Sequence, residues 1–543
     1  MEPYNYPLLL KQLLSSPIAQ RSRKEIVSGG HRFTYPDLVG RIHRLGSALH
    51  RMGIGIGGTV AVLDWDTHRY LESYFAVPML GATLMTVNVR LSPDQVAYVI
   101  DHSGAETLFV HNDFVPLIQQ IRAQLPRVKR FVCLCDDGAP VAGLGWDAEY
   151  EALVAGAEGA FEFPEFDENT RATLYYTTGT TGAPKGVYFS HRQLVLHCLT
   201  VLSTISQAAE NGRFSRNDVY MPLTPMFHAH AWGYPYIATL CGWKQVFGGK
   251  FDPAAAVALA LREGVTFSHC VPTILDMVLN VPAAASADFG RWKVLIGGSA
   301  LPRALARRAQ ARNIDVYCGY GMSETAPLIS LAQVKTDALE GAADIDERDL
   351  DLRLTQGMPI LLAQVRVVDE AMRDVPQDGQ SVGEVVLRTP HVTQGYHDNP
   401  EAGAKLWAGG WMHTGDIGRF DSDGYLQLID RQKDAIKTGG EWISSITLED
   451  LIGQLPGVRE VAVIAIDDDK WGERPLALVV ARDPGLDAGQ VQAHLLSAAQ
   501  RGVIPRYAVP DRCVLVQELE KTSVGKLDKK RLRDLYARPA LPG

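Results

Sequence analysis

Residues 173–191 form a glycine- and threonine-rich stretch that reads TLYYTTGTTGAPKGVYFSH. A strand-like apolar run leads into a turn whose glycines let the backbone approach a ligand closely, and successive N–H groups in such a turn bind anions. Pro184 before the lysine and Gly186 after it exclude the G-x-x-x-x-G-K-[ST] pattern. The stretch predicts a loop that cradles a polyphosphate, with the candidate ligands Thr177, Thr178, Gly179, Thr180, Thr181, Gly182 and Lys185.

The regions around this loop alternate between strand-like and helix-like runs, over residues 56–135 and again over about 266–329. In the segment that starts at residue 92, Ser92 and Gln95 form a capping box and Pro93 suits a first helical turn. Repeated alternation of this kind predicts parallel sheets covered by helices. After about residue 430 the pattern changes to a few strands and one helix, which predicts a small α+β domain.

Length and charge restrict the class of protein. A chain of 543 residues is too long for one hydrophobic core, and its net charge of −9 without a long Lys/Arg run argues against a nucleic-acid partner. The 7 cysteines are scattered, which is typical of free thiols in a reducing compartment. The start lacks the basic flank of a signal peptide, and no apolar stretch reaches the ~20 residues of a membrane span. We therefore expect a cytoplasmic protein without an integral membrane segment.

Four further segments follow the phosphate loop, and they suggest a family. They are 320–325 (YGMSET), 411–416 (WMHTGD), 430–445 (DRQKDAIKTGGEWISS) and 521–526 (KTSVGK). In this order the five segments resemble the motifs of the adenylate-forming superfamily, which includes acyl-CoA synthetases, firefly luciferase and peptide-synthetase adenylation domains. The version GGEWISS, with WGERP at 471–475, is most similar to medium- and long-chain fatty acyl-CoA synthetases.

This resemblance implies an α/β fold with a large N-terminal domain of layered parallel sheets and helices (1–430), a hinge (431–433) and a mobile C-terminal domain (434–543). It also implies a nucleotide site. Glu324 would bind Mg²⁺, Tyr320 would lie against the adenine and Asp416 would accept the ribose hydroxyls. The remaining ATP-site residues that it implies are Gly298, Ser299, Ala300, Gly321, Met322, Ser323 and Arg431.

The resemblance also assigns residues to the acid and to coenzyme A. His228 would lie beside the reacting carboxylate, and Trp232 would gate an acyl tunnel. Gly439, Gly440 and Glu441 would form the CoA loop, Lys526 would be the catalytic lysine and Lys433 the hinge residue. From the residues alone, the H-A-H at 228–230 could also be two loop histidines, since no third metal ligand is suitably spaced.

The reaction implied is activation of a carboxylic acid by ATP as an acyl-adenylate, followed by transfer of the acyl group to CoA. Three alternatives remain open at this stage: an enzyme that loads a carrier protein, a luciferase-like oxygenase, and a non-catalytic nucleotide- or acyl-binding module. Family members are often homodimers, so the resemblance also leads us to expect a homodimer.

Overall fold

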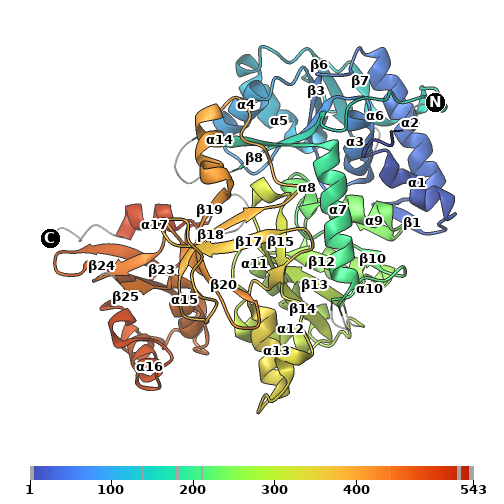
Figure 1. The fold of residues 1–543 in the computed structure, drawn as a ribbon. Helices are drawn as coiled ribbons and strands as arrows, with labels where there is room; N and C mark the ends of the chain where they lie inside the picture. The colour runs from blue at the N-terminus through green and yellow to red at the C-terminus, as the bar shows by residue number, and fades with distance from the viewer. Residues whose placement is uncertain are drawn as a thin grey trace.

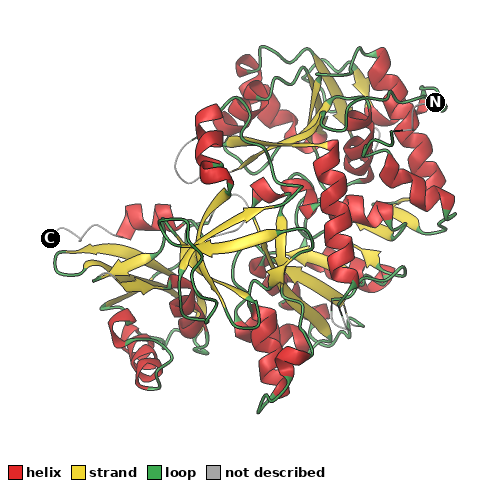
Figure 2. Ribbon diagram, viewed as in Figure 1, coloured by secondary structure: helices red, strands yellow, loops and turns green. Residues whose placement is uncertain are grey.

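The computed structural model describes residues 5–136, 139–177, 183–208, 212–290, 292–439, 441–521 and 527–536. Within these ranges the strands form four sheets. Figure 2 shows three of them in the upper and central part of the molecule, among helices, and the last one in a lobe at the left. The predicted α/β fold class is confirmed.

The first sheet has the strand order β7-β6-β5-β3-β4-β8-β9. All neighbours are parallel except β9, which is antiparallel to β8. The strands are β3 (Thr59–Leu63), β4 (Thr83–Thr86), β5 (Thr107–His111), β6 (Arg130–Leu134), β7 (Ala148–Glu149), β8 (Arg171–Thr177) and β9 (Lys185–Ser190). The helices that pack around them are α2 (Tyr35–Arg51), α3 (His68–Met79), α4 (Pro93–His102), α5 (Val115–Ile121) and α6 (Tyr150–Ala155). The capping box predicted at Ser92 and Gln95 is present at the start of α4.

The second sheet has the order β16-β15-β14-β13-β12-β10-β11-β1-β2, parallel in the middle and antiparallel at both edges. Its strands are β1 (Glu25–Ser28), β2 (His31–Thr34), β10 (Val219–Tyr220), β11 (Lys244–Phe247), β12 (Phe267–Cys270), β13 (Trp292–Ile296), β14 (Ile314–Gly321), β15 (Leu328–Leu331) and β16 (Met358–Pro359). Its helices are α1 (Gln12–Ala19), α7 (His191–Ser206), α8 (Ala229–Trp232), α9 (Tyr234–Leu240), α10 (Pro253–Glu263), α11 (Pro272–Leu279), α12 (Arg303–Gln310) and α13 (Ile345–Leu354).

One hydrophobic core joins the first two sheets. It contains Leu84 of β4 and Phe109 of β5 together with Phe267 of β12 and Leu295 of β13. Figure 1 shows α7 extending from the upper lobe down beside the second sheet. Side chains from both sheets therefore pack into the same core.

A third sheet, β17-β18-β19-β20, is antiparallel throughout, a feature that the sequence pattern did not predict. It consists of β17 (Gln364–Val368), β18 (Gly383–Arg388), β19 (Met412–Phe420) and β20 (Leu426–Arg431), with α14 (Pro400–Leu406) in the segment between β18 and β19. The last of these strands continues to Arg431, because Asp416 of β19 pairs with Arg431 in the ladder.

The last sheet lies in the lobe at the left of Figure 1. It is built from β21 (Ile436–Thr438), β22 (Glu441–Ile443), β23 (Val458–Asp468), β24 (Gly472–Ala481) and β25 (Arg512–Leu515). Its helices are α15 (Ser445–Gly453), α16 (Ala488–Gln500) and α17 (Lys529–Tyr536). Strands and helices thus alternate less regularly here than in the first two sheets, as the sequence predicted.

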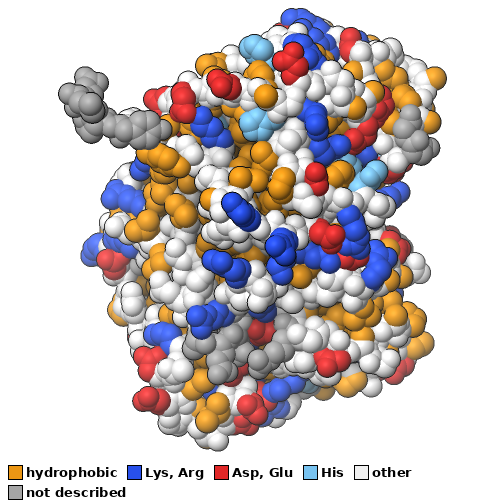
Figure 3. All heavy atoms as spheres, turned by 90° about the vertical axis from the view of Figure 1, so that its right-hand side faces the viewer, with side chains coloured by type: hydrophobic (Ala, Val, Ile, Leu, Met, Phe, Trp, Pro, Cys, Tyr) orange, Lys and Arg blue, Asp and Glu red, His pale blue; other side chains and the backbone are white. Residues whose placement is uncertain are grey.

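The surface gives no sign of one dominant charge on the face drawn in Figure 3. Lys and Arg side chains are scattered there among Asp and Glu side chains, with hydrophobic side chains between them. Among the described helices, none combines the length and apolar character that crossing a membrane requires.

Candidate active site

The predicted phosphate loop connects β8 to β9 as a hairpin. Thr177, the last residue of β8, pairs with Lys185, the first residue of β9. The Lys185 ammonium lies 4.8 Å from the centre of the Tyr396 ring. Thr178, Gly179, Thr180, Thr181 and Gly182 lie outside the described residues, so their predicted contacts with phosphate remain predictions.

The second nucleotide motif lies where β14 ends. A Cβ atom on Gly321 would stand 1.6 Å from the Pro327 carbonyl oxygen, so only glycine fits there. The preceding residue, Tyr320, is buried, and its hydroxyl donates a hydrogen bond of 2.5 Å to Asp416 Oδ2 on β19. The structure thus brings together two residues that were assigned to the adenine and the ribose from segments almost a hundred residues apart.

Glu324 lies in a short 3₁₀ turn, Ser323–Thr325, and is only 6% exposed. Burial raises the pKa of its carboxyl group; a hydrogen bond of 2.7 Å from the Tyr396 hydroxyl and the charges of Lys185 and Arg431 oppose this shift. A carboxylate suits Mg²⁺, which is commonly held by one or two carboxylates with phosphate oxygens and water. In the described part of the chain no three His, Cys, Asp or Glu side chains are placed to hold a metal ion on their own.

A cavity runs between the nucleotide motifs and the turn that contains His228 and Trp232. Glycine at position 297 lets the two sides meet, since a Cβ there would stand 2.9 Å from the Trp232 ring. The lining residues include Gly298 (φ +81°) from the turn after β13 and Arg90 from the loop after β4. The others are Leu223, Thr224, Pro225, His228, Ala229, Trp232, Val271, Ile274, Gly297, Gly319, Tyr320, Gly321, Met322, Ser323, Pro327 and Leu328.

Of the residues predicted for the adenine turn, Gly298 lines this cavity and Ser299 and Ala300 follow it in the loop before α12. His228 lines the cavity, whereas His230 of the same H-A-H is not among the lining residues, and its ring lies 4.8 Å from that of Tyr175. Both ring nitrogens of His230 are buried without a hydrogen-bond partner among the described residues. Of the two histidines, His228 is therefore the one that borders the cavity.

The predicted hinge continues directly from the ribose site. Arg431 Nε lies 3.7 Å from Asp416 Oδ1. Burial, together with the nearby charges of Arg431 and Arg533, lowers the pKa of Lys433. The charges of Asp434 and Asp416 oppose this shift, and the role of Lys433 as a hinge stays a prediction.

Two of the three residues predicted for the CoA loop are described. Gly439 has φ +59°, and its N–H donates to the Trp471 carbonyl oxygen at 2.8 Å. Glu441 begins β22 and is exposed. Gly440 and Lys526 lie outside the described residues, and Lys526 directly precedes the segment that leads into α17.

The side chains at the site that were not found from the sequence include Arg90, Tyr175 and Tyr396. Arg90 reaches the cavity from the first sheet. The Tyr175 hydroxyl donates to the Ser323 carbonyl oxygen at 2.5 Å, and Tyr396 donates to Glu324. Tyr175 lies within the quoted 173–191 stretch, but nothing in that pattern marks it, and the other two lie in segments without a motif.

Fold and site together define an enzyme of the adenylate-forming class, because Tyr320, which lines the cavity, is bonded to the ribose carboxylate Asp416, and the buried Glu324 directly follows the lining residue Ser323. A family model described as "AMP-binding enzyme" matches residues 16–397, and one described as "AMP-binding enzyme C-terminal domain" matches residues 447–526. This chain belongs to the AMP-binding enzyme family, which confirms the family predicted from the motifs.

Individual relatives support this family, and a solved structure supports the fold. A long-chain-fatty-acid–CoA ligase of Thermus thermophilus is 40% identical over 97% of this chain and 96% of its own length. A medium-chain-fatty-acid–CoA ligase of Ectopseudomonas oleovorans is 35% identical over 91% of this chain and 89% of its own length. The crystal structure of the anthranilate CoA ligase AuaEII superposes with a TM-score of 0.84 at 23% identity, covering 98% of both chains, and supports the fold.

Proposed function

We propose that this chain is an ATP-dependent ligase that joins an aliphatic carboxylic acid of medium or long chain to CoA, releasing AMP and pyrophosphate. At the level of reaction class, the prediction from the sequence is confirmed, since both curated relatives described above are acid–CoA ligases. The aliphatic chain and its length are our proposal, which rests on those relatives and on the apolar residues of the cavity.

One observation supports this function above all others. A single cavity is lined on one side by nucleotide-motif residues, Tyr320 to Ser323, and on the other by His228, Trp232 and apolar side chains. An acid bound on the apolar side would present its carboxylate to the α-phosphate of a nucleotide on the other. Holding two reactants in this way removes much of the entropic cost of their reaction.

In the first step a carboxylate oxygen attacks the α-phosphorus of ATP, and pyrophosphate leaves. Lys185 and the hairpin around it would neutralise the phosphates. Glu324 would hold Mg²⁺, which supplies positive charge to the phosphate oxygens when bound. Asp416 and Tyr320 would keep the nucleoside in place, because their mutual hydrogen bond fixes both side chains at one end of the cavity.

In the second step the CoA thiolate attacks the acyl carbon and AMP leaves. We propose that the large unit ends near residue 430 and that residues 434–543 rotate about Lys433 between the steps. Lys526 would then serve the first step, and the loop at Gly439, Gly440 and Glu441 would serve the second. A positive φ at Gly439 favours close approach of the backbone to a ligand.

The test is a screen of acids from acetate to palmitate, with aryl acids included, in the presence of ATP, Mg²⁺ and free CoA. We expect acyl-CoA, AMP and pyrophosphate in equal amounts, with the highest kcat/KM for a medium- or long-chain acid. ADP and phosphate as products would refute adenylation. AMP release without acyl-CoA would favour a carrier protein as acceptor, and a best substrate shorter than butyrate would refute the chain-length proposal.

We also propose that the enzyme is a cytoplasmic homodimer, on the basis of the family resemblance and the free thiols. Sedimentation of the purified protein, with and without nucleotide, tests the dimer directly.

A further inference from the structure

The turn that contains the proposed acid-binding residues has an unusual backbone. Ala229, His230, Ala231 and Trp232 have φ values of 46°, 54°, 46° and 57°, in the left-handed region, and none of them is glycine. L-residues rarely adopt this conformation, and several such residues in succession have a high conformational energy. Such a turn persists only where its surroundings hold it.

Side chains from the first-sheet region hold the backbone just before this turn. Asp66 Oδ1 accepts a hydrogen bond of 2.7 Å from the Met226 N–H. The Tyr74 hydroxyl donates to the carbonyl oxygen of Met226, and Thr86 Oγ1 donates to that of Phe227 at 2.9 Å. The carbonyl of Asp66 also accepts from the Gly249 N–H at 2.9 Å. Asp66 thus ties the end of β3 to two segments of the second-sheet layer.

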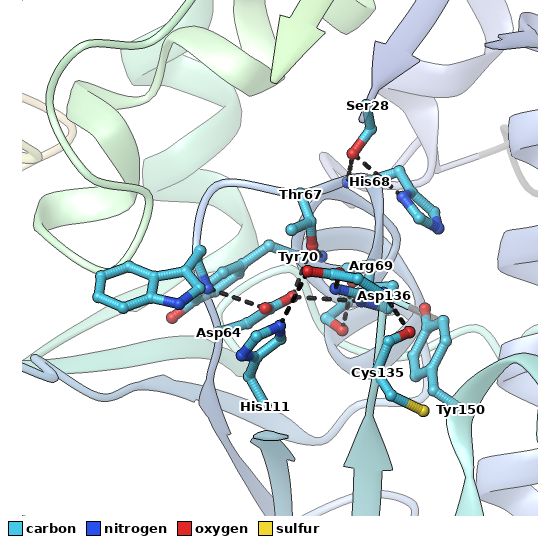
Figure 4. Close-up of polar contacts among 12 residues, drawn as sticks. Ser28, Asp64, Thr67, His68, Arg69, Tyr70, His111, Cys135, Asp136 and Tyr150 are labelled. Carbon is cyan, nitrogen blue, oxygen red and sulfur yellow. Dashed lines mark hydrogen bonds and ion pairs between the residues drawn. The ribbon is translucent and has the colours of Figure 1, made fainter. Parts of the chain in front are cut away.

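A buried polar network keeps Asp66 itself in place. Asp64 accepts a hydrogen bond of 2.5 Å from the Thr67 hydroxyl. Arg69 donates to the Cys135 carbonyl at 3.0 Å and to Asp136 at 2.6 Å. Figure 4 shows these side chains converging from the ends of adjacent strands and from α3. Because the residues on both sides of Asp66 are fixed, its carboxylate is a rigid anchor for the turn.

We propose that Asp66 is a positioning residue for the acid substrate. It holds the left-handed turn in the shape that places His228 and Trp232 in the cavity, and protonation of its carboxyl group weakens recognition of the acid. This inference rests on the proposed function, because it assumes that the acid lies against that turn.

The surroundings of Asp66 determine the direction in which the pKa of its carboxyl group shifts. Burial, foremost, and the nearby Asp64 raise its pKa to about 7, whereas the Met226 N–H and Arg90 oppose the shift. The other titratable groups that face it are tyrosines with raised pKa, which stay neutral: Tyr70, Tyr74 and Tyr220. Above pH 7 the carboxylate accepts the Met226 N–H as a charge-assisted bond, the stronger kind, and below pH 7 that bond weakens.

Three variants separate the hydrogen bond that Asp66 accepts from the negative charge of its carboxylate. Asp66→Asn keeps an oxygen for the Met226 N–H but does not titrate. Asp66→Ala removes the acceptor. Thr86→Val removes the neighbouring neutral hydrogen bond to Phe227 and is the matched control, because it disturbs the same backbone without changing a charge. For each, KM and kcat/KM are measured for the acid and for ATP between pH 5.5 and 8.5.

For the wild type we expect kcat/KM for the acid to fall below an inflection near pH 7 and to level off at a loss no larger than that of Asp66→Ala. Asp66→Asn should lose this inflection and Thr86→Val should keep it. Asp66→Ala should raise KM for the acid by about tenfold or more while KM for ATP stays within about twofold.

Two results would overturn the inference. One is an unchanged inflection in an Asp66→Asn protein whose circular dichroism spectrum matches that of the wild type. The other is an equal rise of both KM values in Asp66→Ala. Either would count only with an active wild type, whereas a wild type that forms no AMP from any acid would instead refute the proposed function.

Discussion

Five buried histidines make the folded protein sensitive to acid. Burial lowers the pKa of His191, His230 and His269 to about 3 and that of His391 to about 4. Burial also lowers the pKa of His197 well below its ordinary range. Each folded pKa lies below the value near 6.5 of an unfolded histidine. Their neutral forms therefore contribute stability that is present above about pH 6.5 and is lost as the pH falls.

The size of this stability loss can be worked out at pH 5.5, which lies one unit below the pKa near 6.5 of an unfolded histidine. At pH 5.5 each imidazole is protonated in the unfolded chain but not in the folded one, which costs about 1.4 kcal/mol of folding stability, or about 7 kcal/mol for all five. The raised pKa of Asp66 acts in the opposite direction. Protonation of its carboxyl group adds about 2 kcal/mol to the folding stability between pH 7 and 5.5. For these six groups together, the loss of about 5 kcal/mol is a large part of a typical stability of about 5–15 kcal/mol.

The assay compares urea unfolding midpoints, followed by tryptophan fluorescence, at pH 7.5 and pH 5.5. His391 is fully buried, and its ring Nε2 lies 3.3 Å from the Leu328 carbonyl oxygen. His391→Gln keeps a donor there without an imidazole, so it should lose about 1.4 kcal/mol less than the wild type on acidification. His50→Gln, at an exposed position, is the control and should behave as the wild type. Equal losses in His391→Gln and wild type would refute the reasoning.

Further predictions concern the two half-reactions. Lys526→Ala should slow reaction from free acid and ATP by about 10²–10³ but leave thioester formation from preformed acyl-adenylate near the wild-type rate; equal impairment of both would contradict its catalytic role. Lys433→Pro should preserve adenylate formation and reduce the CoA step, because proline fixes φ at a point that must sample two conformations; parallel loss of both steps would argue against a hinge. Trp232→Ala should change the preferred chain length more than KM for ATP, and an unaltered acid profile in the screen would count against a gate.

The sequence alone determined the class of enzyme, and it predicted the residues of the nucleotide site. Phosphate binding depends on local backbone chemistry, so glycines, threonines and Lys185 around one turn are sufficient to indicate it. Alternating strand-like and helix-like runs predicted the two parallel sheets, because strands and helices each leave a characteristic pattern of apolar residues in the sequence. The antiparallel third sheet was not found, since its short strands lie among loops and their pairing depends on distant partners.

Only the tertiary structure decided how the cavity is closed and what holds it. Tyr396 meets Glu324, and Arg90 reaches the cavity from another sheet, through packing that no local pattern records. The turn at residues 229–232 contradicts local preference outright: a run without glycine adopts left-handed φ values because Asp66, Tyr74 and Thr86 bind the backbone before it. Motifs describe what a short segment can bind, whereas a strained turn and a buried carboxylate exist only where remote segments supply the compensating contacts.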